Sequence, residues 1–269
     1  MTLTLSRSLN ASMKRLVVTA LALLSAALLP AFSQDCDTLR VMTYNIRFGE
    51  LASMQQIGEY IAGEAPDIVA LQECDWATAR SLAPHQNGVK FVNELAYWSG
   101  MFGLYGKTID FAGGYYGIGM LSRYPILRSE RVLLPNNGKC EPRCMLVADV
   151  ELPSGRIVTF VCTHLEVSSS ELRQEQVRFI NRYFRGVRNQ IVLCGDMNAE
   201  PDSREMLMLS RHWLNLTGDE YTFSTAKPKH KLDYIWSRPA SKAELLSTSV
   251  CTGVKLSDHF PVVSEFIVK

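Results

Sequence analysis

The apolar run Ile191-Val192-Leu193-Cys194 is followed directly by Gly195-Asp196-Met197-Asn198. Four consecutive apolar residues are typical of a strand that is buried on both faces. The Asp and the Asn then lie at the carboxyl end of this strand, where ligand sites of α/β folds are found. The alternative is an ordinary turn, because Asp and Asn side chains readily bond their own backbone.

Further polar clusters end apolar runs in the same way along the chain. They are Thr43-Tyr44-Asn45, Leu71-Gln72-Glu73, Thr163-His164-Leu165 and Ser257-Asp258-His259-Phe260-Pro261. This repetition favours one common site at a sheet edge over a set of unrelated turns.

The N-terminal segment has the pattern of a secretory signal peptide. Lys14 and Arg15 precede an uncharged apolar run over 16–29, and Ala31-Phe32-Ser33 offers small residues for cleavage. The run is shorter than the roughly 20 residues of a membrane helix. We therefore expect a signal peptide over 1–33, no membrane span, and a secreted or periplasmic mature chain.

Residues 34–269 are expected to form one domain, because no linker, repeat or low-complexity tract divides them. The whole chain has 28 Lys and Arg and 27 Asp and Glu, and three of the basic residues precede position 34, so the mature net charge is (28 − 3) − 27 = −2. Five arginines between 173 and 188 alternate with Glu171 and Glu175, which is typical of a solvated helix face. No stable nucleic-acid binding is expected.

The order of predicted elements indicates an α/β fold. Strands are expected over 39–44, 68–72, 102–108, 116–121, 126–133, 145–152, 156–163, 191–196, 231–236, 243–250 and 260–268. Helices are expected over 53–64, 89–98 and 168–184, with a short one after Pro201-Asp202. Helices near both ends and successive strands between them predict two packed mixed β-sheets with helices outside.

The seven cysteines all follow residue 33, in a chain expected to enter an oxidising compartment. Cys162 and Cys194 lie in apolar runs and are predicted to be buried thiols. Cys140 and Cys144 flank a loop, which makes them the best candidates for a local disulfide.

Together with Tyr116-Gly117, Leu121-Ser122-Arg123-Tyr124-Pro125-Ile126 and Leu232-Asp233-Tyr234-Ile235, the polar clusters form a series that resembles the motifs of the endonuclease/exonuclease/phosphatase superfamily, in that family's order. The series extends from Thr43 to Pro261. The resemblance implies a deoxyribonuclease I-like, four-layer sandwich, and a metal-dependent phosphoric ester hydrolase.

Phosphoester cleavage itself calls for such residues. A phosphodiester anion repels hydroxide, so a hard divalent cation must neutralise its oxygens, and Mg²⁺ binds one or two carboxylates while keeping several waters. Glu73 is the first expected carboxylate ligand, the resemblance implies Asp258 as the second, and Asn45 is expected to complete the metal site. Mn²⁺ is the alternative ion.

The resemblance also assigns catalytic roles. His259 is expected to pair with Asp233, serving either as a general base or as a protonated contact to the phosphate. Asp196 and Asn198 would orient the attacking water, and His164 would donate to a phosphoryl oxygen. Arg143 and Tyr116 are candidates of second rank, because Arg143 could instead pair with Glu141 and Tyr116 could be a packing residue.

These expectations describe a secreted Mg²⁺-dependent phosphodiesterase that cleaves an extracytoplasmic phosphate ester by in-line attack of water, as a monomer. Its substrate would be a small phosphodiester, a lipid head group or a nucleic acid. One alternative is a secreted nuclease that cleaves DNA or RNA. Another, of a different class, is a catalytically silent binding module on the same fold.

Overall fold

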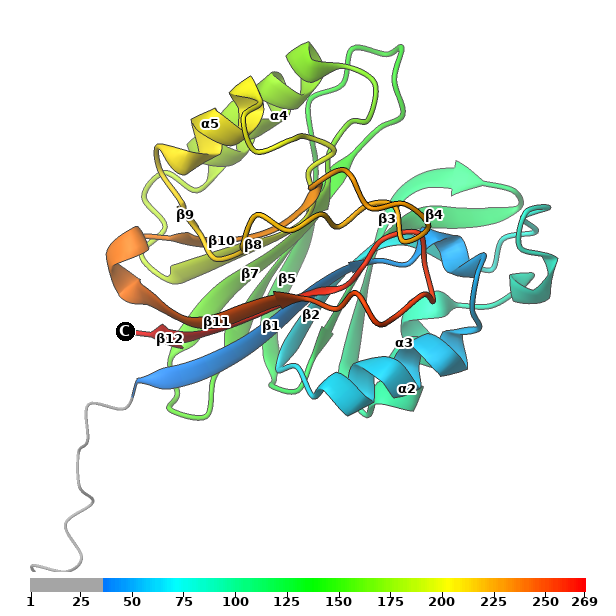
Figure 1. Ribbon diagram of the computed structural model, residues 1–269, viewed down its shortest axis with the longest axis horizontal. Coiled ribbons are helices and arrows are strands. Elements are labelled where there is room, and N and C mark those ends of the chain that lie inside the picture. Colours follow the sequence, from blue (N-terminus) through cyan, green and yellow to red (C-terminus); the bar gives the residue numbers. More distant parts are fainter. Residues whose placement is uncertain (1–35) are drawn as a thin grey trace, which may run out of the picture. The chain divides into compact units, whose positions relative to one another are not determined.

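The computed structural model describes residues 36–269, and the predicted signal peptide over 1–33 lies outside them. Two six-stranded sheets make up the centre of the described part (Figure 1). The first sheet contains, in spatial order, β11 (Ala243–Val250), β12 (Val262–Val268), β1 (Asp37–Asn45), β2 (Ile68–Trp76), β4 (Gly114–Ser122) and β3 (Phe102–Phe111). The second contains β5 (Ile126–Leu133), β6 (Cys144–Glu151), β7 (Ile157–His164), β8 (Gln190–Asp196), β10 (Asp233–Arg238) and β9 (Leu214–Asn215).

Four α-helices lie outside the sheets: α2 (Met54–Glu64), α3 (Phe91–Ser99), α4 (Ser170–Tyr183) and α5 (Arg204–Ser210). Short 3₁₀ turns occur at η1 (Arg47–Gly49), η2 (Pro84–Gln86) and η3 (Ala240–Lys242). Three of the helices begin after a serine whose hydroxyl accepts a backbone N–H, namely Ser53, Ser169 and Ser203. None of the helices in residues 36–269 combines the length and the apolar composition needed to cross a membrane.

Three hydrophobic clusters define the layers. Leu39 and Val41 of β1 pack into the core between the two sheets. The alternate residues Met42 and Tyr44 pack against α2 and α3 on the other face. A third cluster joins the outer face of the second sheet to α4 and α5. The central strands are therefore covered on both faces, and the predicted sandwich of two mixed sheets flanked by helices is confirmed.

Each sheet contains one parallel pair of strands near its centre. β1 and β2 are parallel and are connected through α2, while β7 and β8 are parallel and are connected through α4. A parallel pair needs such a crossover, and its two carboxyl ends meet at the same edge of the sheet. The side chains of Asn45 in β1 and Asp196 in β8 are in contact, with Asn45 Nδ2 3.0 Å from Asp196 Oδ2. The two edges therefore meet in one place.

The structure differs from the sequence predictions in two details. The short strand β9 was not expected, because two residues carry no periodic pattern. The predicted disulfide between Cys140 and Cys144 is wrong, since both are free thiols. Cys144 begins β6 and is buried between the sheets, with its Sγ 3.0 Å from Thr108 Oγ1, whereas Cys140 stays in the preceding loop.

Candidate active site

A pocket of about 340 Å³ opens where the carboxyl ends of the parallel strands meet. Most of the residues predicted for the site line it: Glu73, Tyr116, Arg143, His164, Asp196, Asn198, Asp258 and His259. The remaining two, Asn45 and Asp233, are fully buried and are hydrogen-bonded to lining residues. The fold therefore brings together all the predicted site residues.

Strand register places three of these side chains next to one another. His164 of β7 is the partner of Asp196 in the parallel pairing of β7 with β8. Asp233 of β10 is the partner of Asp196 on its other side. Gly195 allows the close approach of β7, because a Cβ atom there would lie 2.0 Å from the carbonyl oxygen of Thr163.

Glu73 reaches the pocket because of a bulge in β2. The pairing of β2 with β4 shifts between Leu71 and Cys74, and Glu73 has a φ of 60°. Such a backbone is uncommon for a residue with a side chain, and bulges of this kind redirect side chains beside active sites. Asn45 Nδ2 donates to Glu73 Oε1 at 3.1 Å. Burial raises the pKa of Glu73 and Asp258 adds to this, although Asn45 and His259 oppose the rise.

His259 is held between two carboxylates. Its Nδ1 lies 2.9 Å from Asp233 Oδ2, and its Nε2 lies 3.6 Å from Asp196 Oδ2. Burial disfavours the charged ring, but the negative charges of Asp233 and Asp196 outweigh it and raise the pKa of His259 to about 10. The imidazole is therefore protonated at neutral pH, and Nδ1 donates to Asp233.

At Asp196, the effects that favour the neutral carboxylic acid outweigh those that favour the carboxylate. Burial, followed by the charge of Asp233, raises its pKa to about 7 in spite of the stabilising His259, the Asn198 backbone N–H and the Asn45 amide. The Asn198 N–H donates to Asp196 Oδ1 at 2.9 Å. Asp196 can therefore change its protonation state near neutral pH while its orientation is fixed.

His164 has a defined tautomer. Arg143 Nη1 lies 3.2 Å from His164 Nδ1, and since a guanidinium only donates, Nδ1 accepts and Nε2 carries the proton. Burial, with Arg143 and His259 nearby, lowers the pKa of His164 well below its ordinary value. Its Nε2 lies 3.6 Å from Asp196 Oδ2, so a neutral N–H donor stands at the pocket.

Arg143 satisfies both interpretations that the sequence allowed. Its Nη1 pairs with Glu141 Oε1 at 3.0 Å, and its side chain also lines the pocket beside His164. Tyr116 lines the pocket as well, and burial raises its pKa far above the ordinary value, so it keeps its hydroxyl proton.

Of the three residues predicted to bind the metal, Glu73 and Asp258 suit a hard cation, whereas Asn45 has another role. Glu73 and Asp258 line the same pocket and offer carboxylate oxygens, the ligands that Mg²⁺ prefers. Asp258 forms an ion pair with Arg47, so a divalent ion would replace that guanidinium as its counter-charge. Asn45 accepts the Arg47 backbone N–H through Oδ1 at 3.0 Å, and its Nδ2 faces the carboxylates. It therefore positions Glu73 and Asp196.

Asp196, Asp233 and His259 form a second cluster of ligand-type atoms, within 4.8 Å of one another. A protonated imidazole has no free lone pair for a metal ion. With His259 protonated and hydrogen-bonded to Asp233, this cluster is better suited to proton transfer and phosphate contact than to holding a cation.

Several residues of the pocket were missed by sequence reasoning. The apolar side chains of Val167, Leu232 and Phe223 line it, and the Phe223 ring lies 4.8 Å from the His259 ring, centroid to centroid. Nothing near 223 marks it, because it is in an irregular loop. The motifs could have indicated Leu232, which directly precedes Asp233. They could also have indicated Arg47, two residues after Asn45, which pairs with Asp258.

Two helix-flanked sheets with a carboxylate- and imidazole-lined pocket at their joint edge define the deoxyribonuclease I-like class of phosphoesterase folds. The chain belongs to the endonuclease/exonuclease/phosphatase family, whose sequence profile matches residues 42–259. Members of this family are hydrolytic phosphoesterases.

One curated protein and several solved structures are similar to the chain over most of its length. The uncharacterized protein YbhP of Escherichia coli K12 is 25% identical over 247 residues, which cover 85% of this chain and 96% of YbhP. An endonuclease/exonuclease/phosphatase structure from Beutenbergia cavernae has a TM-score of 0.72 at 24% identity, covering 86% of this chain and 72% of its own. A mannosyl-6-phosphatase of Bacteroides thetaiotaomicron has a TM-score of 0.66 at 18% identity, covering 85% and 99%.

Proposed function

We propose that this protein hydrolyses a small phosphodiester with the help of a divalent metal ion, with Mg²⁺ preferred and Mn²⁺ as the alternative. The observation that carries the proposal is the buried arrangement of Asp233, His259 and Asp196 beside the neutral donor His164. Burying several charges costs several kcal/mol per ion, and a packed apolar cluster would stabilise the fold better. A silent binding module would gain nothing from this arrangement.

The chain's own residues supply the parts of an in-line attack by water. Asn198 Nδ2 donates to the Leu165 carbonyl at 3.0 Å, which leaves its Oδ1 as an acceptor for the water. Above a pH of about 7, the Asp196 carboxylate accepts the water proton as the water oxygen bonds to phosphorus. The P–O bond to the alcohol group breaks in the same step, and the departing oxygen takes a proton from solvent. His259 and His164 each present Nε2–H near Asp196, where the phosphoryl oxygens would lie.

The metal ion would be held by Glu73 and Asp258, and when bound it neutralises charge on the phosphoryl oxygens. Arg143 would add a second positive charge and keeps His164 in its donor tautomer. Tyr116 would add a neutral hydroxyl donor.

Charge balance favours a diester over a monoester. Glu73, Asp196 and Asp258 line the pocket together with Arg143 and His259. The direct charge partners of these groups are Asp233, Glu141, Glu166 and Arg47, so the sum over the site is 3 − 6 = −3. A divalent ion changes this sum to −1. A monoester then brings two further negative charges and a diester only one, so the monoester is disfavoured more in a partly buried site.

The test compares bis(p-nitrophenyl) phosphate with p-nitrophenyl phosphate, each with Mg²⁺ or with a chelator. We expect metal-dependent hydrolysis that is faster for the diester and only weakly dependent on salt. Faster hydrolysis of the monoester would contradict the charge argument. No hydrolysis of either ester with Mg²⁺ or Mn²⁺ would overturn the proposal.

Duplex DNA should be a poor substrate in the same assay at low and physiological salt. A protein that grips DNA neutralises several phosphates, and its binding falls steeply as salt rises. Efficient DNA cleavage that collapses with salt would favour a nuclease instead.

Export is part of the proposal, because residues 1–33 have the signal-peptide pattern. Expression of the full chain in a bacterial host, followed by N-terminal sequencing of the exported fraction, should give a protein that begins at Gln34. An uncleaved chain retained in the cytoplasm would contradict it.

A further inference from the structure

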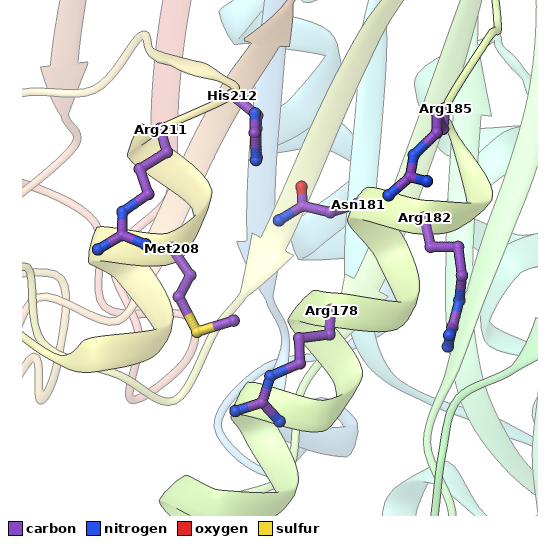
Figure 2. Close-up of a pocket in the computed structure, with 7 residues that line it drawn as sticks. All are labelled: Arg178, Asn181, Arg182, Arg185, Met208, Arg211 and His212. Atoms are coloured by element: carbon purple, nitrogen blue, oxygen red, sulfur yellow. The ribbon is translucent and has the colours of Figure 1, made fainter.

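A second hollow, which we call the basic groove, lies between α4 and α5 (Figure 2). Its volume is about 320 Å³. Its lining consists of Arg178, Asn181, Arg182, Arg185, Arg211 and His212, together with the side chain of Met208. Figure 2 shows Arg178 of α4, and Arg185 in the turn after α4, extending toward α5, with Asn181 and His212 between the helices. No carboxylate is among these lining residues.

The groove is separate from the active-site pocket. The end of α4 leads through residues 184–189 into the first residue of β8, and the pocket lies at that strand's last residue, Asp196. A strand of this length spans about 20 Å. A ligand in the basic groove is therefore not the reacting phosphoester.

The arginines of the groove differ from Arg173 of α4 in having no carboxylate partner. Arg173 Nε lies 2.6 Å from Glu205 Oε1, and that glutamate is fully buried. Within residues 36–269, no carboxylate lies within ion-pair distance of Arg178, Arg182, Arg185 or Arg211, and all four are exposed. Arg173 thus holds α4 to α5, while the groove arginines have no such structural partner.

Asn181 is fixed so that a donor faces the groove. The indole Nε1–H of the buried Trp213 donates to Asn181 Oδ1 at 2.7 Å. The amide oxygen is thereby occupied, and the Nδ2 group, with two N–H donors, remains for the groove. The groove therefore contains an oriented neutral donor among its guanidinium groups.

The negative C-terminal ends of α4 and α5 are too weak to neutralise the four arginines of the groove. α4 and α5 both end at the groove, and each C-terminus carries about half a negative charge. Two such ends offset about one of the four arginine charges. A positive potential therefore remains in the hollow.

The shape of the groove selects among anionic ligands. A volume near 300 Å³ is at the lower end of small-ligand pockets. Single-stranded nucleic acid would need a series of large aromatic side chains on which successive bases stack, and the lining contains no Phe, Tyr or Trp. A membrane surface would need projecting apolar side chains, whereas Met208 is half-buried. We infer that the basic groove binds a compact multivalent anion carrying two or more phosphoryl groups.

The test is calorimetric titration of the full chain with sodium tripolyphosphate at low salt, in buffer without divalent ions. We expect saturable binding of one anion per chain. Arg178→Gln combined with Arg211→Gln should weaken it about 100-fold, since each charge-assisted hydrogen bond contributes about tenfold. Asn181→Asp keeps an acceptor for Trp213 but replaces the donor by a negative charge, and should weaken binding at least about tenfold.

The matched control replaces two exposed cations outside the groove, Arg123→Gln with Lys139→Gln. This variant has the same net charge as the groove variant and should bind tripolyphosphate within about twofold of the parent chain, because both side chains lie outside the direct contacts. Equal losses in both variants would mean that net charge alone attracts the anion and would overturn the inference. The inference would also be overturned if tripolyphosphate showed no saturable binding, or if the chain bound only phosphatidylglycerol vesicles or duplex DNA.

Discussion

The active-site pocket and the basic groove hold charged side chains in opposite ways. In the pocket, Asp233, His259 and Asp196 are buried and hydrogen-bonded, and the pKa values of His259 and Asp196 are raised to about 10 and about 7. In the groove, the arginines are exposed, and within residues 36–269 none of them has a carboxylate within ion-pair distance.

The difference shows what burial contributes to a site. A low-dielectric setting strengthens each interaction and makes protonation depend on neighbouring groups, which suits proton transfer. An exposed groove attracts anions through its positive electrostatic potential, and dissolved salt screens this potential within about 10 Å. The pocket is thus built for chemistry on one phosphoester, and the groove for reversible binding of an anion.

The largest expected effect is the loss of turnover on changing the pocket. Asp196→Asn and His259→Gln remove charge and proton-transfer capacity with little change of volume, and each should lower kcat about 10²- to 10⁴-fold. The measurement is steady-state hydrolysis of bis(p-nitrophenyl) phosphate, with circular dichroism to confirm folding. In the double variant, kcat should fall by less than the product of the two single-variant factors, since these groups act together. Near-normal rates in either single variant would contradict the assigned roles.

The next largest effect separates the two kinds of arginine on α4. Arg173→Met would leave the buried Glu205 without its cation and should lower the free energy of unfolding by about 3–5 kcal/mol. Arg178→Gln, in the groove, should change it by about 0.5 kcal/mol or less. Urea unfolding of the two variants checks this. Equal destabilisation would show that the groove arginines are structural.

The dependence of activity on pH should be set by the pocket alone. Asp196 must be deprotonated, so kcat/KM should rise about tenfold per pH unit up to a pH of about 7. His259 must be protonated, so kcat/KM should fall above a pH of about 10. The two midpoints belong to the interacting groups as a set. A flat activity profile across pH 6 to 8 would contradict the role of Asp196.

The smallest expected effect concerns the ion pair of Arg47 with Asp258. Arg47→Gln removes the cation that competes for Asp258, so the Mg²⁺ concentration for half-maximal activity should fall by up to about fivefold, because a partly exposed pair is worth about 1 kcal/mol or less. Arg47→Lys retains the charge and is the control. A weaker requirement in both variants, or a higher Mg²⁺ requirement in Arg47→Gln, would argue against Asp258 as a metal ligand.

Most of the fold followed from local sequence patterns. The strand over 157–164 and the helix over 170–183 were expected within two residues of their bounds, because apolar periodicity and N-terminal serines act over a few positions. The short β9 and the free state of Cys140 and Cys144 were not foreseen. Both depend on where distant strands lie.

The site residues were identified by type and order, since a polar residue after a buried strand is visible in the sequence alone. Which atom bonds to which was decided by tertiary structure. Asn45 and Asp196 are 151 positions apart, and Arg47 and Asp258 are 211 apart, so no local pattern predicts their contacts. The tautomer of His164 depends likewise on Arg143, which β6 and β7 bring beside it.

The arginines in and directly after α4 also show that a local sequence pattern does not predict side-chain contacts. By itself, the sequence determined that they lie on an exposed helix face near two glutamates. Only the packing of α5 against α4 decided that Arg173 is paired with Glu205 while Arg178, Arg185 and Arg211 share a hollow. Side-chain type and spacing are properties of one segment, but a pocket and its electrostatic potential arise from several segments that folding brings together.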